Sequence, residues 1–295
     1  MSKSKIFPIK LNHIKMLIFN TINALRQYLN QERINEKSVG FVPTMGALHV
    51  GHLSLIDASK KDNDLTVCSI FVNPTQFNNP DDLARYPRTL EADCAMLEPA
   101  GCDVVFAPST EEIYTERPVM KFDFGDLETV MEGKFRPGHF NGVGIVVSKL
   151  FNIIQPNRTY FGQKDLQQTA VIGRMMKDMS YQIEFNICPT LRETDGLAMS
   201  SRNRNLLPEH RAVASEIFKL LSGAKKQLLD RKPVSEVLLF GRNYLKSFLY
   251  FELEYFEIVN AFSLQNIDKI QPITQNAICV AAYLGKIRLI DNFVF

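Results

Sequence analysis

Short apolar runs alternate with helical patterns over the first two thirds of the chain. Five runs rich in β-forming residues predict strands at residues 39–43, 65–72, 103–106, 158–161 and 181–187. Between them, apolar residues recur at a spacing of three to four and predict helices at 52–61, 89–100, 142–154 and 166–179. This alternation predicts an α/β domain with a parallel sheet covered by helices on both faces. Ligands of such sheets usually bind beyond the carboxyl ends of the strands.

The pattern changes after Pro189. Two successive helices are predicted at 209–229 and 233–249, and strands follow at 252–259, 277–283 and 287–291. Helices followed by strands favour a separate, smaller α+β domain. We therefore expect a sheet domain to residue 189 and a second domain over 190–295.

Composition narrows the class of protein. The 295 residues carry a formal net charge of +2, which disfavours a protein that coats a polyanion. No apolar run approaches the ~20 residues needed to cross a bilayer. The five cysteines are odd in number and lack C-x-x-C spacing, so a disulfide framework or a zinc knuckle is not expected. We expect a soluble cytoplasmic protein that binds neither nucleic acid nor membrane.

A strand-to-helix turn carries the first candidate site, made of Met45, Gly46, Ala47, Leu48, His49, Val50, Gly51 and His52. Free backbone N–H groups at a helix start favour a phosphate. Glycine allows the backbone to approach a ligand closely. His49 and His52 are three residues apart, so both imidazoles are expected to donate to the same phosphates. The structural alternative is that one histidine caps the helix and the other fills space. A zinc pair is a weaker alternative, since no third ligand is near.

Three other segments offer polar groups for a ligand. Gly162, Gln163, Lys164 and Asp165 repeat the strand–glycine–helix pattern, in which Lys164 supplies a cation and Asp165 is an equal candidate for a helix cap. Gln168 follows one turn later. Leu191, Met199, Ser200, Ser201 and Arg202 lie at the domain junction, and Arg202 suits a triphosphate, although such a loop is often only solvated. Asn73 and Gln76 offer neutral groups for a hydroxy acid, or simply form an Asn-Pro turn.

Six motifs, in order, resemble those of the pantoate–β-alanine ligase family: PTMGALHVGH, FVNPTQF, YPRT, RPGHF-NGV, FGQKDLQQ and PT-LRETDGLAMSSRN. The resemblance runs from about Met16 to Asn292, and together the motifs are far more specific than any one of them. HVGH is similar to the HIGH signature of a wider group of nucleotidyl transferases, and MSSR is similar to its KMSKS signature. Residues 1–15 precede the usual family start, and we interpret them as an extension or an overlong choice of start codon.

The resemblance implies a Rossmann-like domain and two half-reactions. Pantoate attacks the α-phosphorus of ATP and releases pyrophosphate, and β-alanine then attacks the acyl adenylate to give pantothenate and AMP. It implies that His52, His49 and Lys164 are catalytic and that Gln76, Gln168 and Asn73 hold substrate. It also implies that the turn at 45–52, the segment at 162–165 and the junction residues line ATP. Mg²⁺ is an implied cofactor, with Asp93 a candidate ligand unless it is an ordinary exposed helical residue. A homodimer is also implied.

Two other functions compete with this interpretation. Another HIGH-motif nucleotidyl transferase would act on a different small substrate, although FVNPTQF and the paired Gln167 and Gln168 favour the ligase. A nucleic-acid-binding descendant of a synthetase-like fold is disfavoured by the charge of +2 and by the absence of tryptophan.

Overall fold

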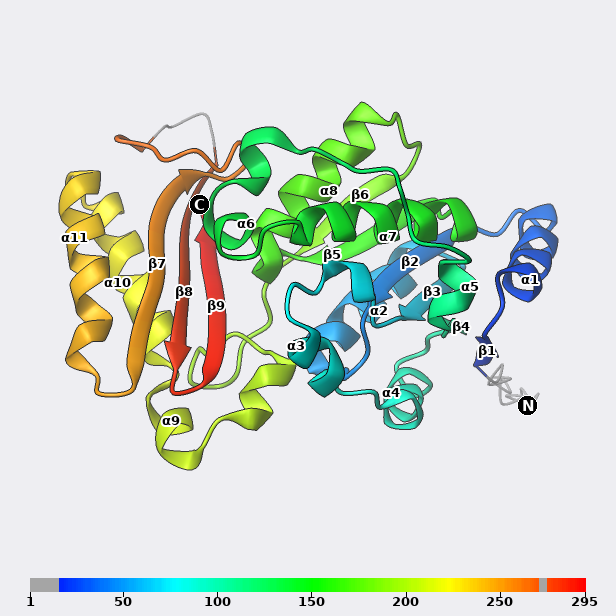
Figure 1. The fold of residues 1–295 in the computed structure, drawn as a ribbon, viewed down its shortest axis with the longest axis horizontal. Coiled ribbons are helices and arrows are strands. Elements are labelled where there is room, and N and C mark those ends of the chain that lie inside the picture. Colours follow the sequence, from blue (N-terminus) through cyan, green and yellow to red (C-terminus); the bar gives the residue numbers. More distant parts are fainter. Residues whose placement is uncertain (1–15, 271–274) are drawn as a thin grey trace, which may run out of the picture.

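The computed structural model describes residues 16–270 and 275–295, so the predicted extension at 1–15 lies outside the described residues. Two sheets lie side by side, each with its own helices (Figure 1). The larger one is a parallel sheet of six strands in the order β1-β4-β3-β2-β5-β6. Its strands are β1 (Leu17–Phe19), β2 (Val39–Thr44), β3 (Leu65–Ile70), β4 (Val104–Phe106), β5 (Arg158–Gly162) and β6 (Glu184–Cys188).

Helices cover both faces of the parallel sheet. The helices of this unit are α1 (Ile22–Ile34), α2 (Val50–Asp62), α3 (Pro80–Arg85), α4 (Leu90–Leu97), α5 (Thr110–Ile113), α6 (Met131–Phe135), α7 (His139–Ile154) and α8 (Leu166–Asp178). Of these, α1, α7 and α8 pack on one face of the sheet, and α2 and α4 pack on the other. Neighbouring strand residues face opposite sides, so Phe41 packs with α1, α7 and α8 while Val42 packs with α2. Both faces are therefore apolar, which explains the nearly continuous apolar runs of these strands.

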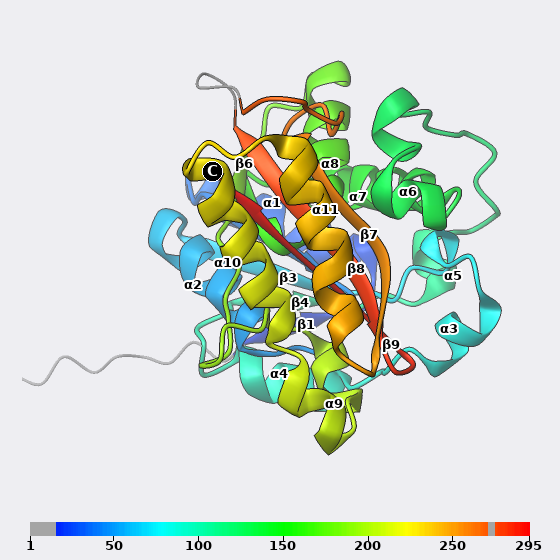
Figure 2. The ribbon, with the colours of Figure 1, turned by 90° about the vertical axis from the view of Figure 1, so that its left-hand side faces the viewer.

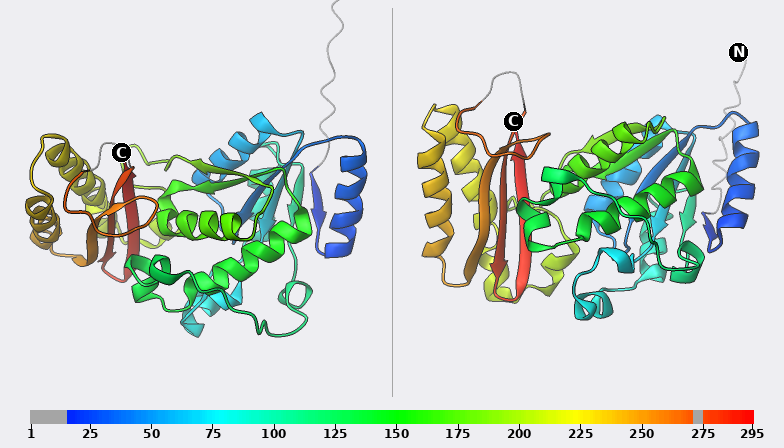
Figure 3. Two further views of the ribbon diagram at one scale, coloured as in Figure 1. Left: turned by 90° about the horizontal axis from the view of Figure 1, so that it is seen from above. Right: turned by 45° about the horizontal axis from the view of Figure 1, so that its top comes forward.

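The second unit is an antiparallel sheet backed by two helices. Its elements are α9 (Pro208–Val213), α10 (Glu216–Leu229), α11 (Val234–Tyr244), β7 (Phe251–Asn260), β8 (Asn276–Leu284) and β9 (Ile287–Val294). Figure 2 shows α10 and α11 lying across one face of this sheet. The other face packs on the first unit, as the two views of Figure 3 show, and Ala277 and Cys279 of β8 contact Met131 and Leu166 there.

The expected fold class is confirmed, with shifts at element ends. The prediction of a single helix at 209–229 is wrong, because this segment is divided into α9 and α10. The apolar stripe of α10 packs on the antiparallel sheet, whereas α9 has no buried residue. The helix predicted to continue to 249 ends at Tyr244, and the one predicted to start at 142 starts at His139. The strand predicted at 181–187 begins only at Glu184, and that at 65–72 ends at Ile70.

Candidate active site

The order of strands in the parallel sheet locates a ligand crevice. From β2 the chain proceeds outward to β3 and β4, and it later returns to the other side of β2 as β5 and β6. A crevice for ligands opens at such a switch point, beyond the carboxyl ends of the two central strands. Here those ends lead into the start of α2 and into the 3-10 turn Gln163–Asp165. Two of the predicted site segments are thus adjacent.

His49 and His52 cap the first turn of α2 for each other. The N–H of Gly51 donates to Nδ1 of His49 at 3.1 Å, and the N–H of His49 donates to Nδ1 of His52 at 3.2 Å. Their rings lie 4.1 Å apart between centroids. A Cβ on Gly51 would lie 2.8 Å from the His49 ring, so glycine is required for this cap. The alternative prediction that a histidine caps this helix is therefore correct, and both histidines do so. The cap hydrogen bonds also fix the orientation of the two rings.

Burial and nearby charges determine the protonation of both rings. Burial, together with the nearby charges of Lys164 and Arg204, lowers the pKa of His49 to about 4. Burial, His49 and Lys164 lower the pKa of His52 to about 3. Both imidazoles are therefore neutral at pH 7, and since Nδ1 accepts a hydrogen bond, the proton resides on Nε2. Each ring offers one Nε2–H donor to a ligand.

Asp93 of α4 supports the turn before α2. It is 2% exposed, and its carboxylate accepts from the N–H of Ala47 at 3.0 Å and from the N–H of Leu48 at 2.7 Å. Gly46 and Ala47 both have a positive φ, at 80° and 51°, and a Cβ on Gly46 would lie 2.9 Å from Asp93. Asp93 is thus buried and not the ordinary exposed residue that was the alternative prediction. It stabilises the turn at Gly46 and Ala47, where φ is positive.

This arrangement disfavours Asp93 as a metal ligand, because both of its oxygens already accept from the backbone. Among the described residues, no group of three His, Cys, Asp or Glu side chains could hold a metal ion. Magnesium usually takes only one or two protein carboxylates together with substrate phosphates. The described residues therefore do not form an Mg²⁺ site built from protein side chains alone.

Lys164 supplies a cation close to the two imidazoles. Its charge acts on both histidines, its side chain is 19% exposed, and its Nζ lies 3.7 Å from a carboxylate oxygen of Asp165. Asp165 makes no side-chain cap on α8, so the alternative of a helix cap is wrong. A Cβ on Gly162 would meet nothing within 4 Å, so the fold does not require this glycine.

The side-chain amide of Gln76 is held in place by Met45 and Asn73. Its Nε2 lies 3.1 Å from the Met45 sulfur, and its Oε1 accepts from Asn73 at 3.0 Å. Asn73 is 1% exposed and also bonds Tyr114, Thr75 and the carbonyl of Gly142. In this structure Asn73 therefore supports Gln76, and its own contact with substrate stays a prediction.

The two glutamines at the start of α8 differ. Gln167 is buried, and it donates to the carbonyls of Leu127 and Val130 while accepting from the N–H of Glu132. Within the residues that the structure describes, the side-chain amide of Gln168 has no hydrogen-bond partner. The amide of Gln168 is thus free for a ligand, whereas that of Gln167 holds the loop before α6.

The segment of Met199, Ser200, Ser201 and Arg202 lies against the start of α2. A Cβ on Gly51 would be 3.5 Å from Cβ of Met199, and Arg204 donates to the carbonyl of Leu48 at 3.1 Å. Ser200 accepts from the N–H of Arg202 and so caps the turn Ser201–Asn205. Val50 and Leu191, both expected to line ATP, are 54% and 38% exposed.

Tyr86 and Arg136 lie in the motifs YPRT and RPGHF, but no role is predicted for them from the sequence. The charge of Arg202 acts on both. Burial is the main cause that lowers the pKa of Arg136; the charge of Glu132 raises it, and the charges of Arg202 and Arg288 lower it.

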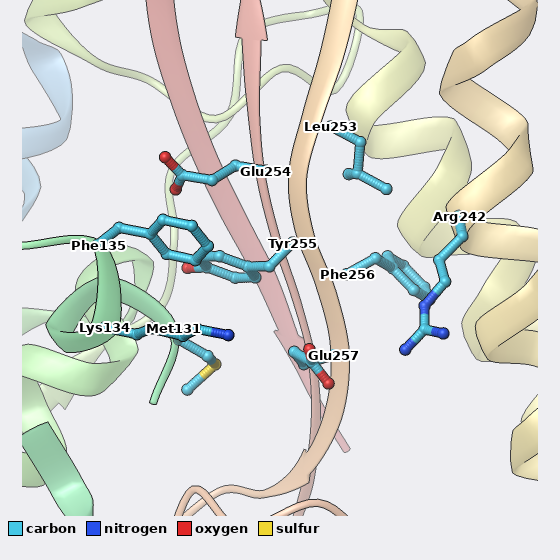
Figure 4. A pocket seen from close by; sticks show the side chains of 9 residues that line it. All are labelled: Met131, Lys134, Phe135, Arg242, Leu253, Glu254, Tyr255, Phe256 and Glu257. Atoms are coloured by element: carbon cyan, nitrogen blue, oxygen red, sulfur yellow. The ribbon is translucent and has the colours of Figure 1, made fainter. Parts of the chain in front are cut away.

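A separate cavity of about 280 Å³ lies between α6 and the antiparallel sheet. Figure 4 shows Phe135 beside Tyr255, with the two rings stacked at 6.0 Å. Glu254, which also lines this cavity, is bound by Arg288, and Arg288 binds Glu132 as well. This cavity belongs to the contact between the two units and contains none of the predicted site residues.

These features define a class of α/β protein: one that binds a phosphate-bearing ligand at the switch point of a parallel sheet, with imidazole donors at a helix start. Residues 17–294 match the family model described as pantoate-beta-alanine ligase. The chain belongs to the pantoate-beta-alanine ligase family and is a ligase.

Individual relatives agree over nearly the whole chain. Pantothenate synthetase of Cytophaga hutchinsonii is 50% identical over 95% of this chain and 99% of its own, and that of Porphyromonas gingivalis is 47% identical with the same coverage. The pantothenate synthetase structure from Thermus thermophilus has a TM-score of 0.88 at 41% identity, over 94% of this chain and 99% of its own. A pantoate-beta-alanine ligase from Francisella tularensis, complexed with beta-gamma ATP and beta-alanine, has a TM-score of 0.77 at 37% identity, over 95% and 97%. The resemblance is confirmed.

Proposed function

We propose that this chain joins pantoate to β-alanine in two half-reactions that share one site. The observation that carries the proposal is the convergence of two neutral imidazoles and Lys164 at the switch point of the parallel sheet. In the first half-reaction, a carboxylate oxygen of pantoate attacks the α-phosphorus of ATP and pyrophosphate leaves. In the second, the amine of β-alanine attacks the acyl carbon, AMP leaves and the amine loses a proton.

The residues at α2 meet the main electrostatic demand of the first half-reaction. Negative charge moves onto the departing pyrophosphate, and fixed donors aimed at that charge stabilise the transition state. Lys164 supplies a positive charge, while the Nε2–H groups of His49 and His52 supply donors that need no reorientation. Neutral imidazole is suited to this role because a low pKa keeps the donor unchanged across physiological pH.

Pantoate is proposed to lie against the free amide of Gln168 and against Gln76, which Asn73 aims. ATP is proposed to follow the backbone of the α2 turn and of Gln163–Asp165, and to meet Ser200, Ser201 and Arg202. Holding the reactants in line supplies a large share of the rate, on the order of 7 kcal/mol when alignment is good. No protein nucleophile is needed for this chemistry.

Residues 190–295 are proposed as a lid domain over a sheet domain of residues 16–189. Separate apolar cores and the contacts of Met199 and Arg204 with the start of α2 support this division. A closed site would protect the acyl adenylate from water. We expect Mg²⁺ to enter on the phosphates of ATP, since the described residues offer no cluster of their own for it.

The test is AMP release by the purified chain with ATP, pantoate and β-alanine, omitting each in turn. We expect AMP only with all three, and pyrophosphate exchange into ATP with pantoate alone and without tRNA. Exchange with other small acids but not with pantoate would instead identify a different HIGH-motif nucleotidyl transferase. Exchange with neither would contradict adenylate chemistry.

Two further proposals concern the state of the protein. We propose a homodimer, to be checked by light scattering coupled to size exclusion; a monomeric mass at micromolar concentration would contradict it.

We propose a cytoplasmic location because all five cysteines are free thiols. No helix within the described ranges has the length and apolarity to span a membrane.

A further inference from the structure

Asn292 of β9 holds the turn that carries Lys164. Its Nδ2 donates to the carbonyl of Gln163 at 3.0 Å and to that of Lys164 at 2.8 Å, while Nε2 of Gln163 lies 3.5 Å from its Oδ1. Asn292 is 3% exposed. One buried side-chain amide of the second unit thus donates hydrogen bonds to the backbone carbonyls of both Gln163 and Lys164.

The preceding residue holds a different segment of the site. Asp291 binds the guanidinium of Arg192 through two hydrogen bonds of 2.6 and 3.0 Å, and that guanidinium also contacts the rings of Phe218 and Phe293. Arg192 begins a hairpin in which the N–H of Met199 donates to the carbonyl of Leu191 at 3.0 Å. The hairpin leads directly into Ser200 and Arg202.

Strand geometry explains how adjacent residues serve both segments. Successive side chains of a strand project to opposite faces. Asn292 therefore faces the parallel-sheet unit, where it bonds the Lys164 turn, while Asp291 projects from the opposite face toward Arg192. The spacing between Lys164 and the Arg202 segment is consequently fixed through two consecutive residues of one strand.

We propose that Asn292 is a positioning residue for the ligase reaction, acting through the backbone of Lys164; this rests on the proposed function. Without the two donations, the carbonyls of Gln163 and Lys164 would bond water, and the turn would be free to shift. A shift of about 1 Å near reacting groups costs up to about 100-fold in rate. The loss should fall on the half-reaction that uses Lys164.

A double-mutant cycle separates positioning from general stability. We expect Asn292→Ala to lower kcat for pantoate-dependent pyrophosphate exchange by roughly 10- to 100-fold, on the order expected for such a shift, with KM for β-alanine unchanged in the overall reaction. In the Lys164→Ala background the same change should cost less than about 3-fold, because its effect passes through Lys164. Asn292→Asp, which keeps the volume but loses both donations, replaces the alanine variant if that chain does not fold.

Asn63 provides a matched control. It is a buried asparagine whose Nδ2 also donates twice, to the carbonyl of Ser59 at 2.8 Å and to the hydroxyl of Tyr160 at 2.9 Å, at the end of α2 away from the histidine pair. We expect Asn63→Ala to lower the melting temperature and to leave exchange within about 3-fold. Equal losses in both backgrounds, an equal loss in Asn63→Ala, or unchanged exchange in the Asn292 variant would overturn the positioning role and leave the proposed function standing. A wild-type chain without pantoate-dependent exchange would overturn both.

Discussion

At the scale of single residues, the site depends on which nitrogen of each imidazole carries a proton. The sequence predicts His49 and His52 as a pair, because H-x-G-H follows a buried strand. Their neutral state could not be predicted, because it depends on burial and on Lys164, which lies more than 100 positions later in the chain. The role of Gln167 could not be predicted for the same reason, because its partners lie 35 to 40 positions earlier in the chain.

His52→Asn tests the Nε2–H donor separately from the cap. The asparagine Oδ1 can accept from the N–H of His49 as Nδ1 of His52 does, but it places no donor where Nε2 lies. We expect pantoate-dependent pyrophosphate exchange to fall by about 10²- to 10³-fold. The free energy of unfolding in urea should stay within about 0.5 kcal/mol of wild type, as for a retained cap. Near-normal exchange in this variant would remove the donor role.

His139 gives a pH-dependent prediction for stability. Its Nδ1 donates to the carbonyl of Gln76 at 2.8 Å, and burial and Arg136 lower its pKa to about 4. The unfolded histidine has a pKa of about 6.5, so between that pH and about 4 the unfolded state binds more protons and stability falls as pH falls. Above the unfolded pKa this contribution is constant.

His139→Asn keeps the donor to Gln76 but removes the titrating group. It should be less stable than wild type at pH 7.5, and the gap in free energy of unfolding should shrink by roughly 2 kcal/mol by pH 4.5. Urea unfolding of both chains at several pH values measures the gap. A constant or widening gap would mean that the folded His139 is not held neutral.

At the scale of elements, the start of α2 depends on α4. The sequence predicts both helices, and their ends are correct to within a few residues. It did not predict β1 or α1: β1 is only three residues long, too short to show a period, and α1 is largely polar because it buries only Leu25 and Leu29. The division between α9 and α10 was also missed, since the helical period continues across a break of only two residues.

Asp93→Asn tests the support that α4 gives to the α2 turn. An amide cannot accept from two backbone N–H groups with both of its polar atoms, so one of Ala47 and Leu48 loses its partner. We expect a loss of about 2 kcal/mol in the free energy of unfolding, in the presence of a chelator. Unchanged stability combined with a higher Mg²⁺ requirement would instead restore Asp93 as a metal ligand.

At the scale of the whole molecule, β9 is a strand through which the two units contact each other. Arg288 binds Glu132 of α6 through two hydrogen bonds of 2.8 and 2.7 Å and also binds Glu254. Burial would raise the pKa of Glu132, but the hydrogen bonds and charge of Arg288 outweigh it and lower that pKa. The sequence predicted two units and their order, but not this contact, because no local pattern pairs residues 156 positions apart.

Arg288→Met removes the cation and leaves two buried carboxylates beside each other. We expect a loss of about 3–5 kcal/mol in the free energy of unfolding at pH 7.5. Adding Glu132→Gln and Glu254→Gln should recover part of that loss, because no unpaired charge remains. Urea unfolding of the single and triple variants provides the measurement, and equal stability of the two would contradict the charge argument.

The hydrogen bond from Asn292 to the carbonyl of Lys164 joins residues 128 positions apart, and it therefore affects the order in which the site forms during folding. The parallel sheet and its helices involve only residues before β7, whereas Lys164 is held in place only once β9 has paired and docked. During refolding, contacts that close long loops form late. We therefore expect helical circular dichroism to recover first and the capacity for adenylate formation to return in a later, slower phase.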